Sequence, residues 1–294
     1  MSAPIEVTPE LLASWRPPPV AHETDKDARG RVLVLAGGAQ VAGATLLTAV
    51  AALRAGAGTL QVGAPRSLAL GLALALPEAR VIPAPETPEG ELAPEAAGAL
   101  GEALAKCDAA VIGPGMLDEG AAGELALRVI AGDAPALVID AAAMQGPAKD
   151  PKRAHPLSGR LVLTPHAGEM AAILGCDKDE VEADPLGVAR KAAANMKAVI
   201  VLKGAVTLIV SPDGSAWSHD GGSPGLATSG SGDVLSGIIV GLLARGASPA
   251  QAAVWGVYVH AKAGARLSKR IGRVGFLARE LLDEIAPVLD GLEA

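Results

Sequence analysis

Aromatic side chains and long hydrophobic runs are scarce in this sequence. The 294 residues include one Phe, one Tyr and three Trp, too few for the aromatic platforms on which single-stranded nucleic acid stacks. No apolar run reaches the roughly 20 residues of a membrane-spanning helix, and the start of the chain lacks the pattern of a secretory signal. We therefore expect a cytoplasmic protein that binds neither nucleic acid nor membrane.

Positive charge and cysteine are also in short supply. The formal net charge is −7 and no long basic run is present, which disfavours polyanionic partners. A small anionic ligand stays compatible with this balance, because helix N-termini and loop amides bind phosphate without net positive charge. Cys107 and Cys176 lie far apart and show no metal-ligand spacing, as expected of two buried thiols in a reducing compartment.

Hydrophobic residues make up half of the chain, enough for a sizeable core. Short apolar segments alternate with helical patterns, which indicates a mainly parallel sheet covered by helices on both faces. A Pro-Asp-Gly turn at 212–214 predicts an antiparallel hairpin at one edge. We expect one domain at 29–294, preceded by a Pro-rich extension at 1–28 with a short helix near 8–15. The predicted strands begin the segments 31–38, 59–65, 109–115, 136–144, 160–175 and 198–214.

Glycine, proline or ionisable residues follow most of these strands. Ligands bind beyond the carboxyl ends of the strands in open parallel sheets, so a shared site is expected there. The residues concerned are Gly37–Gly38, Gly113–Gly115, Asp140, Thr164–His166, Lys203–Gly204 and Gly230–Asp233.

The stretch GLATSGSGDVLSG at 225–237 runs from several glycines into an apolar helical pattern. Free N–H groups and the helix dipole at such a start favour a phosphate or a developing negative charge. Asp233 is then either a helix cap or an acid/base group held beside the anion.

Three further side chains each have two interpretations. Lys203 is either a solvated lysine at a strand end or a nucleotide contact, with Gly204 allowing close approach of the backbone. His166 is either structural or a ligand contact, and Glu169 suits the first turn of the following helix. Asp140 either caps a helix or helps to hold a metal.

The remaining histidines form no recognisable constellation in the sequence. His260 lies with Trp255 and Lys262 in a late helical segment and is expected to be structural or at the surface. His22, His155 and His219 fall in polar, loop-like stretches. No serine–histidine–aspartate or cysteine–histidine arrangement and no zinc motif is evident.

Taken in order, the motifs resemble those of the ADP/ATP-dependent NAD(P)H-hydrate dehydratase family over roughly residues 26–290. The resemblance implies an α/β, ribokinase-like three-layer sandwich with a mainly parallel central sheet flanked by helices. The matching stretches are GRVLVLAGG, AGATLLTAVAALRAGAGTLQVGAP, VIGPGM, LVIDAAAM, LTPHAGEMAAILG, VLKGAVTLIVSPDG and GLATSGSGDVLSGIIVGLLARG.

The same resemblance implies repair of a damaged cofactor. Members restore NADH and NADPH from their 6-hydroxy hydrates by phosphorylating the ring hydroxyl and then losing phosphate. Bacterial members typically use ADP and release AMP and phosphate, with Mg²⁺ assisting. The resemblance also implies a separate NAD(P)H-hydrate epimerase, since too few residues precede the first strand for that domain, and a homotetramer.

Residue roles transfer by position within these motifs. The hydrate would contact Ala44, Gly115, His166 and Asp233, and Asp233 would act as the acid/base. The adenine nucleotide would be lined by Lys203, Gly204, Ala205, Val206, Thr207 and Gly232. The family's usual threonine is Ser231 here, which keeps the hydroxyl, whereas Ala142 replaces a frequent aspartate and Ala42 a frequent tyrosine.

Two other functions share much of this pattern. A ribokinase-like kinase of a small molecule, such as a vitamin precursor, would carry the same glycine turn and acid. A catalytically silent nucleotide-binding protein would keep the fold without turnover.

Overall fold

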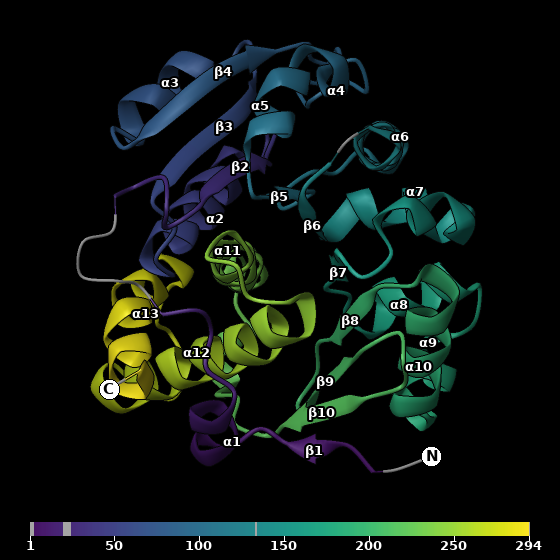
Figure 1. Ribbon diagram of the computed structural model, residues 1–294, viewed down its shortest axis with the longest axis vertical. Helices are drawn as coiled ribbons and strands as arrows, with labels where there is room; N and C mark the ends of the chain where they lie inside the picture. The colour runs from purple at the N-terminus through teal and green to yellow at the C-terminus, as the bar shows by residue number, and fades with distance from the viewer. Residues whose placement is uncertain (1–2, 20–24, 133, 294) are drawn as a thin grey trace.

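A single ten-stranded sheet runs through the whole molecule in the order β1-β10-β9-β8-β7-β6-β5-β2-β3-β4 (Figure 1). The computed structural model describes residues 3–19, 25–132 and 134–293. His22 and parts of the 1–28 extension lie outside these ranges. The strands are β1 Ile5–Glu6, β2 Arg31–Leu35, β3 Thr59–Pro65, β4 Ala79–Ala84, β5 Ala109–Ile112, β6 Ala136–Ile139, β7 Leu161–Leu163, β8 Val199–Leu202, β9 Thr207–Val210 and β10 Ala216–His219.

The central part of the sheet is parallel and one edge is antiparallel. Strands β4, β3, β2, β5, β6, β7 and β8 pair in parallel, while β9 pairs antiparallel with both β8 and β10. The hairpin predicted from the Pro-Asp-Gly turn is thereby confirmed. The edge strand β1 pairs with β10 and comes from within the predicted extension, so part of that segment belongs to the sheet.

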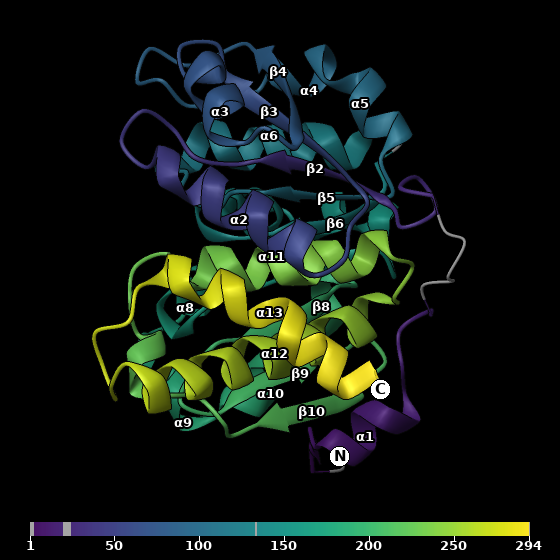
Figure 2. The ribbon, with the colours of Figure 1, turned by 90° about the vertical axis from the view of Figure 1, so that its left-hand side faces the viewer.

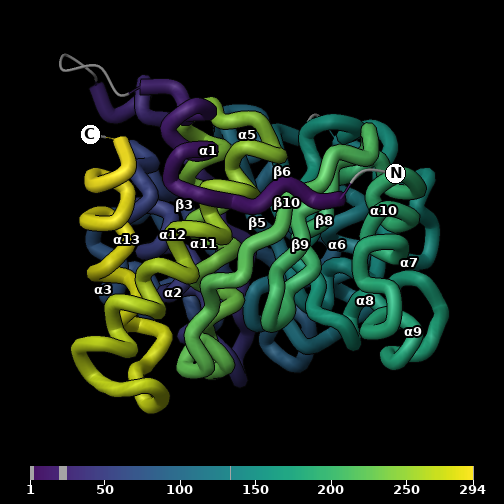
Figure 3. The backbone as a smooth tube through the Cα atoms, turned by 90° about the horizontal axis from the view of Figure 1, so that it is seen from below, coloured from purple at the N-terminus to yellow at the C-terminus, as the bar shows by residue number. Residues whose placement is uncertain are grey.

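Helices cover both faces of the sheet and complete a three-layer sandwich. Helices α2, α11, α12 and α13 lie together on one face (Figure 2), and α4 to α10 pack on the other. α1 lies beside β1 at the sheet edge (Figure 3). The helices are α1 Pro9–Ser14, α2 Ala42–Arg54, α3 Ala69–Ala75, α4 Ala96–Ala99, α5 Gly101–Lys106, α6 Glu119–Ala131, α7 Gln145–Lys149, α8 Ala167–Leu174, α9 Lys178–Ala183, α10 Pro185–Met196, α11 Ser231–Ala244, α12 Pro249–Arg270 and α13 Ala278–Glu293.

The apolar runs of the sequence supply two separate cores. Successive side chains of a strand point to opposite faces, so Val32 and Val34 of β2 pack beneath α2 and α11, while Leu33 and Leu35 pack against the other helical layer. All four are fully buried, which explains why the strands show unbroken hydrophobic runs instead of an alternating pattern. None of the helices in the described ranges has the length and apolar character needed to cross a bilayer.

Small residues allow α11 to approach α2 very closely. A Cβ added at Gly237 would lie 2.4 Å from the Thr48 carbonyl oxygen, and one at Gly241 would lie 2.6 Å from that of Ala52. This close packing brings the first turn of α11 against α2, where the Thr48 hydroxyl donates to the Asp233 carbonyl oxygen at 3.2 Å. The position of Asp233 therefore depends on the helix pairing.

Replacing Gly237 with Val should lower the free energy of unfolding by about 1–3 kcal/mol, the usual cost of overpacking a close-packed core. A matched control is Gly291→Ala in α13, where an added Cβ meets nothing within 4 Å. Chemical denaturation followed by circular dichroism measures both variants. Equal stability of Gly237→Val and wild type would show that α2 and α11 are not held at this distance.

Candidate active site

The carboxyl ends of five adjacent strands meet at one edge of the sheet. β8, β7, β6, β5 and β2 are neighbours in that order, so the loops that follow them lie side by side. The Lys203 N–H donates to the Pro165 carbonyl at 2.8 Å, and the Gly37 N–H donates to that of Pro114 at 2.7 Å. The segments that the sequence singled out at strand ends are thus brought together.

A cleft of about 800 Å³ opens beside β8, β9, α11 and α12. Six of the predicted nucleotide and substrate residues line it: His166, Lys203, Gly204, Ala205, Thr207 and Gly232. Val206 belongs to the same loop but does not line the cleft, and 46% of its surface is exposed. Leu226, Val257 and Ala261 give another part of the cleft an apolar wall.

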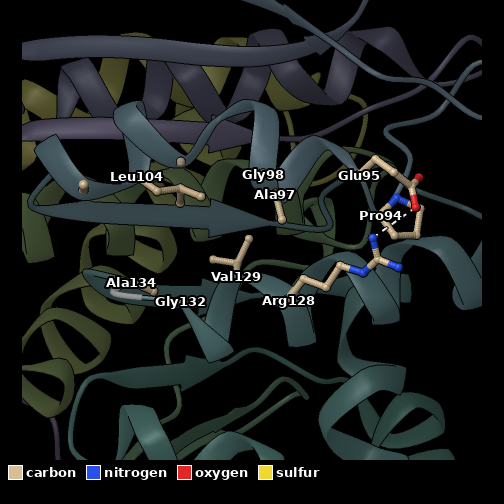
Figure 4. Close-up of a pocket in the computed structure, with 11 residues that line it drawn as sticks. Pro94, Glu95, Ala97, Gly98, Leu104, Arg128, Val129, Gly132 and Ala134 are labelled. Carbon is tan, nitrogen blue, oxygen red and sulfur yellow. Dashed lines mark hydrogen bonds and ion pairs between the residues drawn. The ribbon is translucent and has the colours of Figure 1, made fainter.

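A second hollow, of about 570 Å³, lies between α4, α5 and α6. Its wall is mostly apolar, and Arg128 pairs with Glu95 at 3.0 Å at one end (Figure 4). It contains none of the predicted site residues.

The start of α11 is built to leave backbone N–H groups free. Gly230 precedes the helix with φ of 89°, and no side chain caps this end. The N–H groups of Gly232 and Asp233 have no backbone acceptor within the described residues. A Cβ at Gly232 would meet only the Lys203 Nζ, at 3.6 Å, so the protein itself does not require glycine there. Such an N-terminus has the geometry and dipole of an anion site.

Asp140 is the centre of a buried polar network. Its carboxylate accepts hydrogen bonds from Thr164 Oγ1 at 2.7 Å and Ser236 Oγ at 2.9 Å, and Lys203 Nζ lies 3.2 Å away. Asp140, Thr164 and Ser236 are all buried. Its side chain makes no capping hydrogen bond to the short helix that follows. Asp140 therefore joins β6 to β7, β8 and α11, a role that neither interpretation from sequence included.

Lys203 is held between carboxylates at the mouth of the cleft. Its Nζ lies 3.2 Å from Asp140 and 3.8 Å from Glu169. Burial alone would lower the pKa of Lys203, but the negative charges of Asp140 and Glu169 outweigh burial and raise it. Lys203 is thus a permanently charged group beside the first turn of α11, not a freely solvated lysine.

Asp233 lies in the same environment, and its pKa is unusually high. Burial, and then the negative charge of Asp140, raise its pKa from 3.8 to about 7, while the positive charge of Lys203 works in the opposite direction. A carboxyl group with a pKa near neutrality can take and return a proton at working pH. The sequence singled out Asp233, whereas the rise in its pKa depends on neighbours that only the tertiary structure brings together.

His166 serves as the cap of α8 and also lines the cleft. Its Nδ1 accepts the Glu169 N–H at 3.1 Å, and the Glu169 carboxylate accepts the His166 N–H at 2.7 Å. Because Nδ1 is an acceptor, the neutral ring carries its proton on Nε2. Both interpretations of His166 therefore describe part of its structure: it is a structural cap and it faces the cleft.

Ala44 and Gly115 lie together where α2 meets the 113–115 loop. Gly115 has φ of 68°, and a Cβ there would lie 2.3 Å from the Ala44 Cβ. Ala44 is buried beneath the 113–115 loop, and neither residue lines the cleft. Ala44 is one turn before Thr48 in α2, the residue bonded to Asp233. Asp233 itself does not line the cleft either; it follows Gly232, which does, and Thr48 bonds it to α2.

The sequence placed neither His260 nor His219 at the cleft, and it wrongly put His219 in a loop. His260 lines the cleft, with its Nε2 at 2.9 Å from Ser231 Oγ. His219 is the last residue of β10, not part of a loop, and its ring lies 5.2 Å from that of Tyr258. No local pattern marks either residue, because each reaches the cleft only through the packing of its strand or helix.

The model of the NAD(P)H-hydrate dehydratase family matches residues 32–287. The chain belongs to this family. It is 48% identical over 292 residues to the ADP-dependent (S)-NAD(P)H-hydrate dehydratase of Xanthomonas campestris, with 99% of each chain covered. It is also 41% identical to the bifunctional NAD(P)H-hydrate repair enzyme Nnr of Moorella thermoacetica, of whose length it covers 51%.

Solved structures of the dehydratase family and its superfamily show the same fold. The ADP/ATP-dependent NAD(P)H-hydrate dehydratase of Bacillus subtilis, co-crystallised with ATP/Mg²⁺, superposes with a TM-score of 0.83 at 28% identity over 100% of both chains. A ribokinase-like superfamily protein of Enterococcus faecalis gives 0.81 at 25% identity, covering 98% of this chain and 96% of that one. The predicted ribokinase-like sandwich is confirmed.

The implied magnesium ion can be compared with the side chains in the described part of the chain. Within the described ranges, no group of three or more His, Cys, Asp or Glu is placed to hold an ion. The carboxylate of Asp140 already contacts Thr164, Ser236 and Lys203. Magnesium is often bound through substrate phosphates and water, with few protein ligands. A magnesium ion that enters with the nucleotide would therefore need few ligands from the residues around the cleft.

A titration of Asp233 tests the electrostatics of this dehydratase site. Carboxyl ¹³C NMR of the ligand-free protein should give a midpoint of about 7. Asp140→Asn removes a like charge and should lower that midpoint, whereas Lys203→Met removes an opposite charge and should raise it. If wild-type Asp233 titrates near the ordinary value of about 4, the carboxylate is not buried beside Asp140.

Proposed function

We propose that this protein is an ADP-dependent (S)-NAD(P)H-hydrate dehydratase, which restores NADH and NADPH and releases AMP and phosphate. The observation that carries the proposal is the 48% identity to the Xanthomonas enzyme over nearly the whole of both chains. The site supports it, because a carboxyl group with a pKa raised to about 7 lies beside the free amides of α11. These are the parts that phosphoryl transfer to a hydroxyl requires.

The chemistry assigned to Asp233 is that of a general base. Its carboxylate takes the proton of the C6 hydroxyl of the hydrate while that oxygen forms a bond to the terminal phosphorus of ADP. The bond between this phosphorus and the bridging oxygen breaks, and AMP leaves. Phosphate then leaves C6 with the electrons of the C–O bond, and the departing phosphate takes the proton from C5, which restores the 5,6 double bond.

The anion site at α11 and Lys203 would neutralise the phosphoryl charge. The Gly232 and Asp233 N–H groups supply hydrogen-bond donors whose positions are fixed before the nucleotide arrives. A donor of this kind is worth roughly 10²–10³ in rate when it faces the transition state. Lys203 is held by Asp140 and Glu169, so little side-chain freedom would be lost on binding. Mg²⁺ would enter with the nucleotide phosphates and supply further positive charge.

The nucleotide and the hydrate would occupy opposite sides of Asp233. Lys203 to Thr207 and Gly232 border the cleft, with Val206 as the exposed member, and we assign this side to the adenine nucleotide. Ala44 and Gly115 would border the hydrate. The contact between these two residues would set how closely the 113–115 loop approaches α2. His166 would contact the hydrate from β7, through the proton on its Nε2.

Several accompanying features stay predictions. An NAD(P)H-hydrate epimerase would supply the (S) epimer, and the bifunctional relatives support this link because their names describe a repair enzyme with two activities. A homotetramer, a cytoplasmic location and a single domain at 29–294 are proposed with it.

Incubation with NADPH hydrate and ADP should restore the absorbance of the reduced nicotinamide and release AMP and phosphate in equal amounts. Chromatography of the products and the absorbance change measure this directly. A stable phosphorylated alcohol without a recovered double bond would instead identify a kinase. Binding of ADP with no product of either kind would identify a silent nucleotide-binding protein.

Asp233→Asn should abolish turnover while leaving nucleotide binding in place. The amide keeps the shape of the side chain but cannot accept the substrate proton, so kcat should fall to less than about a tenth of wild type. Steady-state kinetics give kcat, and calorimetric titration with ADP gives the affinity. A variant that keeps more than a tenth of the wild-type kcat excludes Asp233 as the base.

A further inference from the structure

A histidine that the proposed chemistry does not use is bonded to the start of α11. His260 extends from α12, and its Nε2 lies 2.9 Å from Ser231 Oγ. Ser231 is the first residue of α11 and is buried. The contact therefore links a third element to the turn that carries the free amides and Asp233.

The bond to His260 determines what the Ser231 hydroxyl does. A serine near a helix start readily bonds to neighbouring backbone groups, and here the adjacent free donors are the N–H groups of Gly232 and Asp233. Because His260 engages the hydroxyl from the side of α12, those N–H groups stay available to an anion. Among the described residues no side chain caps this end of the helix, and the bond from His260 anchors its first residue from the side of α12.

His260 is suited to this place because it is uncharged. Burial lowers its pKa to about 4; a hydrogen bond to the Ser231 backbone opposes that effect, and the nearby charge of Lys203 adds to it. A neutral imidazole can hold a hydroxyl without repelling Lys203 and without competing with Lys203 for a phosphate.

We propose that His260 is a positioning residue, which acts through Ser231 to aim the Gly232 and Asp233 amides at the phosphate of the nucleotide. The inference rests on the proposed function in one respect, because the loss of kcat expected on changing His260 is a loss in that reaction. It goes beyond that function by assigning a role to His260, which lines the cleft and bonds to the first turn of α11 through Ser231. The Thr48 bond on the α2 side and the His260 bond on the α12 side hold the turn from two directions.

The kinetic test is a cycle of His260→Phe, Ser231→Ala and the double variant. Each single change removes the same hydrogen bond, so each should lower kcat about tenfold, and the double variant should be no slower than the worse single one. Ser231→Thr keeps the hydroxyl and should retain most of the activity. His155→Phe is the matched control, because His155 bonds to the Asn195 carbonyl on the surface and should keep the wild-type kcat and KM.

A second measurement needs neither hydrate nor turnover. Pyrophosphate is added to the full-length protein while ¹⁵N–¹H spectra follow the Gly232 and Asp233 amides. His260→Phe should weaken the pyrophosphate affinity about tenfold, and His155→Phe should not. If wild type fails to convert hydrate but His260→Phe still binds pyrophosphate more weakly than wild type, the proposed function is wrong and the positioning role stands.

Two results would overturn the role of His260. One is a loss in the double variant equal to the product of the two single losses, which means that the side chains act independently. The other is an unchanged pyrophosphate affinity in His260→Phe. Should His260→Phe fail to fold, Ser231→Ala and Ser231→Thr still test the proposal. Equal activity of these two variants would show that the hydroxyl at position 231, and with it the bond to His260, does not contribute to turnover.

Discussion

The contact between Asp140 and Lys203 is the interaction on which the site depends. A buried carboxylate is stable only when charge and hydrogen bonds compensate its lost hydration. Asp140 obtains them from Thr164, Ser236 and Lys203, which belong to β7 and its loop, α11 and the end of β8. Burial lowers the pKa of Lys203, but Asp140 and Glu169 together raise it; burial raises the pKa of Asp233, and Asp140 adds to that rise while Lys203 opposes it. The contacts that stabilise the buried Asp140 therefore also influence the pKa values of Lys203 and Asp233.

Close helix packing places this network against the anion site. The glycines at 237 and 241 allow α11 to lie directly on the backbone of α2, and that contact positions the Thr48 hydroxyl under Asp233. A larger side chain at the interface would move the first turn of α11 relative to the strand ends. Because interiors are close-packed and transmit such shifts, positions that never touch a ligand contribute to the geometry of the site.

Three histidines surround the cleft. His166 caps α8 by accepting the Glu169 N–H at Nδ1. His219 and His260 both have a pKa lowered by burial, so neither adds positive charge at neutral pH. Lys203 is a cation beside the first turn of α11. The two neutral rings leave the position of a phosphate to the backbone amides and Lys203.

Local patterns in the sequence indicated the central parallel strands other than β4, the edge hairpin and the residues grouped at the strand ends, because unbroken apolar runs and glycine turns are properties of neighbouring residues. The ribokinase-like fold was implied by the resemblance of the ordered motifs to a known family. The role of Asp140, the raised pKa of Asp233 and the approach of His260 to Ser231 were decided only by the tertiary structure. Each depends on side chains from distant segments that meet after the sheet and both helical layers have assembled. Burial and charge at such a point are sums over those neighbours, and no short stretch of sequence contains them.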